Sequence, residues 1–222
     1  MQCARLRVVR VVPGIGVIAV ALLACAKRPD PRKLDTDKIR VTSDAKLRTD
    51  TVGDGKFTDL STFVLVEAEN TAEQGAYVTL GGELTNEAGV RVGELRAQSL
   101  WIPAHELRTF ALVDKQRKPR PDAKAAKIYV RGAQLGAPPP AHVDGFKQLD
   151  DVDKVLVQAT IKNEAKRGGN IMVIATFYDD HGKPMTRPFS LLFIDKQAEL
   201  PVQFAGPVGS KRGTIFIGDV AY

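Results

Sequence analysis

Residues 78–89 read VTLGGELTNEAG, and this stretch decides the fold class. Its first eight positions alternate: Val78, Leu80, Gly82 and Leu84 are interleaved with Thr79, Gly81, Glu83 and Thr85. A period of two is that of a β-strand with one buried face. The polar cluster that follows and ends in Gly89 is typical of a hairpin turn. The stretch therefore predicts a strand that enters a hairpin.

A second stretch, IMVIATFY at 171–178, is more uniformly apolar and ends in the polar cluster DDHG at 179–182. No long segment has the 3.6-residue spacing of an amphipathic helix. We therefore expect an all-β fold of antiparallel strands. Further strand candidates are 95–102, 107–113, 128–130, 155–161, 189–194, 200–204 and 215–217.

The chain also repeats itself at an offset of 93 residues. The aligned identities are Val64 with Val157, Asn70 with Asn163, Ala72 with Ala165, Gly75 with Gly168, Gly89 with Gly182 and Leu107 with Leu200. We expect two tandem β-sandwich modules, 58–133 and 150–222, joined by a proline-rich linker at 134–149. The alternative is a single merged sandwich, because a half of about 75 residues holds only a thin core.

The second half is similar to the immunoglobulin-like FxLYD modules of bacterial envelope lipoproteins. The matching residues are Val157, Asn163, Val173, Phe177, Tyr178, Asp179, Asp180, His181 and Gly182. The literal motif is absent, and 189–193 (FSLLF) matches it only in part. The resemblance implies an immunoglobulin-like sandwich and extracytoplasmic binding or structural work, with no known catalysis.

The N-terminus has the pattern of an export signal. Arg5, Arg7 and Arg10 precede an apolar run over 11–23, with no acidic residue before it. The run has about 13 residues, fewer than the ~20 that a membrane-spanning helix needs. We predict a signal peptide over 1–24.

The apolar run ends in Leu22, Leu23, Ala24 and Cys25, which closely resembles the lipobox of bacterial lipoproteins. The resemblance implies cleavage between Ala24 and Cys25 and a diacylglycerol on the Cys25 thiol. The alternative is an ordinary signal peptide, with Cys25 a bystander. Two or more acyl chains anchor a protein stably. Because Ala26 rather than Asp follows the cysteine, the expected location is the outer membrane, facing the periplasm.

Removal of the signal changes the charge balance. The whole chain has 32 basic and 26 acidic residues, whereas 29 basic and 26 acidic residues remain after position 24. Residues 25–57 mix both signs closely and predict a charged flexible tether behind the lipidated cysteine. In an alternative interpretation, 27–33 contacts anionic headgroups.

The residues that most enzymes and metal sites use are sparse. His105, His142 and His181 have no second His or Cys at ligand spacing, and no Gly-x-Ser-x-Gly elbow is present. The acidic run with Asp150, Asp151 and Asp153 lacks EF-hand spacing. We therefore expect no enzyme activity, no metal, no cofactor and no small-molecule substrate.

Two features remain as candidate binding residues. A basic insertion at 115–127 carries Lys115, Arg117, Lys118, Arg120, Lys124 and Lys127 against a single acid, Asp122. Trp101 is the sole tryptophan and is either packed at a strand end against the linker or an anchor for a partner. The insertion has no aromatic residue between its basic ones, and the protein is exported, so nucleic acid is not expected.

These patterns together predict a lipid-anchored envelope protein. Its membrane contact is the lipid on Cys25, and its expected partner is another envelope protein that binds a sandwich edge or loop. The alternative function is binding of an anionic envelope polymer or lipid by the basic insertion at 115–127. A solvated loop without function is the third interpretation of that insertion.

Overall fold

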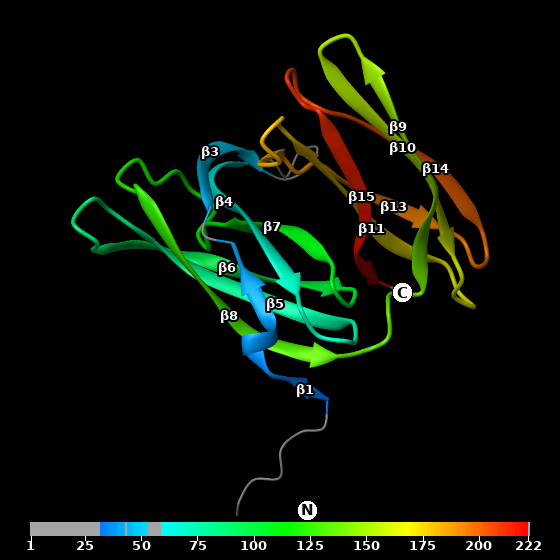
Figure 1. Ribbon diagram of the computed structural model, residues 1–222, viewed down its shortest axis with the longest axis horizontal. Helices are drawn as coiled ribbons and strands as arrows, with labels where there is room; N and C mark the ends of the chain where they lie inside the picture. Colours follow the sequence, from blue (N-terminus) through cyan, green and yellow to red (C-terminus); the bar gives the residue numbers. More distant parts are fainter. Residues whose placement is uncertain (1–31, 43, 53–58, 222) are drawn as a thin grey trace, which may run out of the picture. The chain divides into compact units, whose positions relative to one another are not determined.

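The computed structural model describes residues 32–42, 44–52 and 59–221. The predicted signal peptide, Ala24 and Cys25 lie outside these residues. Within the described part of the chain, no helix is long and apolar enough to span a membrane. Almost all of the regular structure is antiparallel β-strand, which confirms the all-β prediction (Figure 1).

The N-terminal half, taken as residues 32–135, holds two sheets (Figure 1). In one, β4 lies between β7 on one side and β2 and β3 on the other; the second has the order β1-β8-β5-β6. The elements are β1 (Lys33–Leu34), a 3-10 turn (Thr36–Lys38), β2 (Ile39–Val41), β3 (Lys46–Val52), β4 (Asp59–Asn70), β5 (Ala76–Thr85), β6 (Arg91–Ile102), β7 (Leu107–Val113) and β8 (Ala125–Leu135).

The C-terminal half, residues 141–221, also holds two sheets. In one, β10 lies between β9 and β14; in the other, β11 pairs with β12, β13 and β15. Its strands are β9 (Ala141–Asp151), β10 (Lys154–Asn163), β11 (Gly169–Tyr178), β12 (Pro184–Thr186), β13 (Phe189–Ile194), β14 (Glu199–Ala205) and β15 (Arg212–Ala221). The paired strands always belong to the same half.

The internal repeat predicted from the sequence is confirmed by the strand register. Val64 pairs with Leu112, and Val157, 93 residues after Val64, pairs with Phe204, which lies 92 residues after Leu112. The second half is therefore one residue shorter before this strand, and Leu107 corresponds to Glu199 rather than to the predicted Leu200. Gly82 pairs with Ile128, and Ala175 pairs with Ile215 in the same way. The central strands of the two halves therefore pair in equivalent ways, β4 with β7 as β10 with β14 and β5 with β8 as β11 with β15, whereas β1 has no counterpart in the C-terminal half.

A buried asparagine lies at an equivalent corner of each half, where β4 ends in the N-terminal half and β10 ends in the C-terminal half. The Asn70 amide nitrogen donates to the carbonyls of Gln74, Ile102 and Pro103 at 2.8, 3.1 and 3.2 Å. Its carbonyl accepts the Ala72 N–H at 3.1 Å. Asn163 makes the equivalent bonds, donating to the carbonyls of Arg167, Ile194 and Asp195 and accepting from the Ala165 N–H. Both side chains are fully buried. Each asparagine thus joins the end of one sheet to a strand of the other.

The predicted hairpin turns also match. Gly89 and Gly182 have φ values of 75° and 74°, in the region that favours glycine. Asn86 Oδ1 accepts the Val90 N–H, and Asp179 Oδ1 accepts the Lys183 N–H, at 2.9 and 2.8 Å. A short polar side chain at the first turn position thus holds each hairpin.

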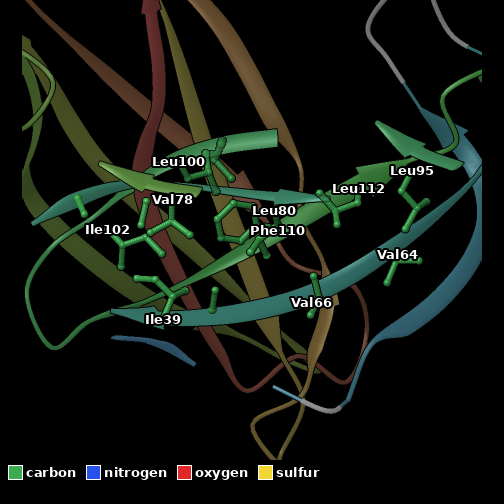
Figure 2. Packing of buried hydrophobic residues seen from close by; sticks show 14 of the residues in the cluster. Ile39, Val64, Val66, Val78, Leu80, Leu95, Leu100, Ile102, Phe110 and Leu112 are labelled. Atoms are coloured by element: carbon green, nitrogen blue, oxygen red, sulfur yellow. The ribbon is translucent and has the colours of Figure 1, made fainter. Parts of the chain in front are cut away.

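The buried apolar side chains form two clusters, one in each half, and the N-terminal cluster also includes Ile174 of β11 and Phe216 of β15. The N-terminal cluster fills the space between its two sheets, and Figure 2 shows labelled members such as Val66, Leu80 and Phe110 gathered between the strands. The C-terminal cluster includes Val157, Ile171 and Phe177.

The prediction of a flexible tether over 25–57 is wrong for the part that the structure describes, 32–42 and 44–52, because these residues contribute strands. β2 and β3 pair along β4, and β1 pairs with β8. Ile39 is buried in the N-terminal core, and Val41 and Leu47 pack against it. Charged residues of both signs stand between and beside these apolar residues, so the alternation typical of a strand is difficult to recognise in the sequence. The first sandwich therefore begins well before residue 58.

The predicted linker is also shorter than expected. β8 extends to Leu135 and β9 begins at Ala141, so only 136–140, with Pro138, Pro139 and Pro140, joins the halves. β9 is needed as a partner for β10, since it occupies the sheet edge that β2 and β3 occupy beside β4. The C-terminal half accordingly starts before residue 150.

We predict that Asn163→Ala lowers the free energy of unfolding by about 3 kcal/mol, because it leaves buried carbonyls without donors. Asn70→Ala should have a comparable effect. Urea denaturation followed by circular dichroism measures both. The control is Asn170→Ala, an exposed asparagine on β11, which should change the value by no more than about 0.5 kcal/mol. Equal losses in Asn163→Ala and Asn170→Ala would contradict the structural role.

Candidate functional site

Ion pairs attach the basic insertion between β7 and β8 to the neighbouring strands β4 and β6. Lys115 Nζ lies 3.1 Å from both carboxylate oxygens of Glu94, and Arg117 Nε lies 2.9 Å from Asp59 Oδ2. Arg120 Nε donates to the fully buried Asp114 at 2.8 Å. Three of the six basic residues of the insertion are therefore paired with acids.

Arg120 also has a structural task at the sandwich edge. Its backbone N–H donates to Thr62 Oγ1 at 2.8 Å, and its guanidinium reaches Gln116 at 2.9 Å. Asp114 in turn accepts the Gln116 N–H at 3.0 Å. These bonds fasten the insertion to β4, and a buried charge needs such partners to be tolerated.

The charge that the insertion offers to a ligand is therefore smaller than the sequence suggests. Within the described residues, Lys118, Lys124 and Lys127 are exposed and have no carboxylate partner. The acids that neutralise the other three cations, Glu94, Asp59 and Asp114, lie outside 115–127. A count of charges within the segment could not include them.

Trp101 lies at the end of β6 and is half-buried. Its indole N–H donates to the Gly136 carbonyl at 3.2 Å, in the short linker. The ring covers Gly75 so closely that a Cβ there would lie 2.5 Å from it. This geometry agrees with the interpretation of Trp101 as a strand end packed against the linker.

The histidines are on the surface. His105 lies 3.1 Å from Glu73, and His142 lies 3.6 Å from Glu164. In the described part of the chain, one group has carboxylate and imidazole atoms close enough for a metal, Asp179 with Asp180 and His181. Asp179 is already engaged by the β11–β12 turn, since backbone N–H groups of Lys183 and His181 lower its pKa. This cluster is a turn, as predicted for Asp179 and Asp180.

A second region, not foreseen from the sequence, lies where β4 and β7 meet β11, β12 and β15. On β4, Val64 and Val66 face the N-terminal core, and Leu65 is buried on the opposite face. On β11, Val173 faces the C-terminal core, whereas Ile174 joins the N-terminal cluster. Both strands are thus buried on both faces, which explains the uniformly apolar 171–178.

This contact contains polar groups. The hydroxyls of Thr109 and Tyr178 are hydrogen-bonded at 3.1 Å, and Thr109 Oγ1 also lies 3.2 Å from Glu67 Oε1. Arg187 Nε donates to the Thr109 carbonyl at 2.7 Å. Burial raises the pKa of Glu67 above its ordinary 4.5, although hydrogen bonds from Thr109 and Tyr178 oppose the shift. Burial likewise raises the pKa of Tyr178.

Arg187 is the most unusual residue of the region. Burial lowers the pKa of its guanidinium to about 9. Its Nη2 is buried and lacks a hydrogen-bond partner among the described residues. The guanidinium lies 5.8 Å from the centre of the Phe216 ring, and Arg108 lies 5.3 Å from that ring. The position between Thr186 and Pro188 gave no sequence signal, because it reads as an ordinary turn.

A cavity of about 550 Å³ adjoins Arg187. Its apolar lining includes Phe63, Leu65, Met172 and Phe189, and its basic lining consists of Arg48, Arg96, Arg117 and Arg187. Asp50 and Asp114 also reach it. Because Arg48 pairs with Phe63 and Ala111 pairs with Leu65, these side chains occupy one outer face of the β3-β4-β7 sheet.

Comparisons with known proteins add little to this picture. No family model matches the sequence, and no curated protein does. Among solved structures, the chain has a likeness to the crystal structure of red sea bream transglutaminase, with 11% identity and a TM-score of 0.23. The match covers 77% of this chain and 29% of that protein. So low a TM-score carries no argument about function.

Glu67 should make stability depend on pH. A carboxyl group whose pKa rises on folding favours the folded state at low pH, and this contribution is lost as pH rises through the folded-state pKa. We therefore predict that Glu67→Gln gains stability relative to the wild type as pH rises from about 4.5. Urea unfolding of both proteins at a series of pH values measures the difference. Parallel stability curves over this range would show that burial of Glu67 has no such effect.

Proposed function

We propose that this protein is a lipid-anchored component of a bacterial cell envelope, held at the outer membrane on its periplasmic side, that acts by binding another envelope protein rather than by catalysis. The observation that carries the anchor is Leu22-Leu23-Ala24-Cys25 at the end of the apolar run. The β-sandwich halves suit a binding role, because sheet edges accept partner strands.

The edge strand β13 is the best candidate for that role. Among the strands that the structure describes, it pairs with β11 alone. Leu191 and Phe193 alternate with the inward-facing Leu192 and Ile194, and they are 56% and 64% exposed. An edge with free backbone groups and exposed apolar side chains is a suitable surface for an added strand. The ion pairs of Lys115, Arg117 and Arg120 make the basic insertion a weaker candidate.

The anchor is tested by Cys25→Ser in the full chain. We expect the wild type to incorporate labelled palmitate and to sediment with membranes, because thiol acylation supplies the stable attachment. The variant should lose both properties. If Cys25→Ser remains in the membrane fraction with undiminished label, the lipid anchor assignment is wrong.

The binding edge is tested by a photo-crosslinking amino acid at Phe193 in living cells. We expect one dominant crosslinked partner, since a strand added to β13 covers this side chain. The matched control places the same probe at Val90, an apolar residue with 59% exposure on the β5–β6 hairpin. The same products from both positions, or none from Phe193, would argue against β13 as the interface.

A further inference from the structure

We propose that the cavity beside Arg187 binds a single-chain amphiphile with an anionic head group. This proposal goes beyond the proposed function, because it needs neither the lipid on Cys25 nor a protein at β13. The cavity volume of about 550 Å³ falls within the ~300–1,000 Å³ of small-ligand sites.

The charge of the lining selects an anion. Of its four guanidinium groups, Arg117 is paired with Asp59, and the acid Asp114 is paired with Arg120. Among the described residues, no carboxylate forms an ion pair with Arg48, Arg96 or Arg187, and Asp50 is the remaining acid of the lining. The lining thus keeps an excess of positive charge.

Arg187 strengthens this preference. Its charge is held in the wall of the cavity, where the surroundings are less polarisable than water and attraction to a nearby anion is stronger. Its Nε is occupied by the Thr109 carbonyl, and Nη2 has no acceptor among the described residues. A bound anion would offset the charge that the fold leaves without an acid partner.

The apolar lining requires more than an inorganic ion. Phe63, Leu65, Met172 and Phe189 contribute to the same cavity. Phosphate alone would leave these groups against water, whereas an alkyl chain would cover them. The shared chemistry is therefore an alkyl chain with a carboxylate or phosphate head.

The proposal is tested by isothermal titration calorimetry on the full chain in nanodiscs of zwitterionic lipid, with empty nanodiscs as the reference. The probes are decanoate and decyl phosphate, each below its micellar concentration, together with decanol below its solubility limit and inorganic phosphate. We expect saturable binding of decanoate or decyl phosphate near one per chain. The tighter of the two identifies the head group, and decanol and inorganic phosphate should bind at least ~10-fold more weakly.

Variants locate the site. Arg48→Gln combined with Arg96→Gln should weaken binding by ~10-fold or more, because it removes two charged donors from the lining. Ala111→Met should also weaken it, by filling cavity volume without changing charge. Lys124→Gln removes an exposed charge outside the cavity and should bind as the wild type does. Circular dichroism confirms that each variant is folded.

Four results would overturn the proposal. They are absence of saturable binding, unchanged affinity in the double arginine variant, decanol binding as tightly as decanoate, and inorganic phosphate binding as tightly as decyl phosphate. The first two remove the site, and the last two remove the need for a head group or for a chain.

Discussion

The repeated buried asparagine is the interaction on which each sandwich depends. Asn70 and Asn163 each supply one amide to three backbone carbonyls that belong to different strands and loops. Without that amide, buried carbonyls at the corner would lose their donors, and buried backbone groups are costly to leave unpaired. The corner also sets where β7 and β14 begin, since the asparagine N–H bonds to Glu106 in one half and to Ala198 in the other.

The contact between the halves makes different demands. At this contact β4 and β11 each bury both faces and β7 lies beside β4, so side chains buried there must be apolar or must find polar partners. Leu65 and Ile174 meet the first condition, and Thr109 with Tyr178 meets the second. Arg187 meets neither condition completely, because its buried Nη2 has no hydrogen-bond partner among the described residues. Groups that a fold leaves unsatisfied are frequent at functional positions, which is why the cavity beside it is of interest.

Much of the fold could be predicted from the sequence, because alternation and turn residues are local signals. The hairpins at Gly89 and Gly182, the equivalence of Asn70 and Asn163 and the all-β class needed no tertiary information. The prediction of a flexible tether over 25–57 was wrong because the local signals there are misleading. Short strands such as β2, with charged residues between their apolar ones, resemble a solvated linker until β4 is present to pair with them.

The sequence by itself determined the all-β class, the internal repeat, the hairpins and the presence of a lipobox-like Cys25, since each is written in neighbouring residues or in a fixed offset. Only the tertiary structure decided that Glu94, Asp59 and Asp114 pair with three of the six cations of the basic insertion. It alone decided that Arg48, Arg96 and Arg187 line one cavity. Ion pairs and cavities depend on which residues distant along the chain become neighbours in space. The periodicity of the sequence does not indicate which residues these are.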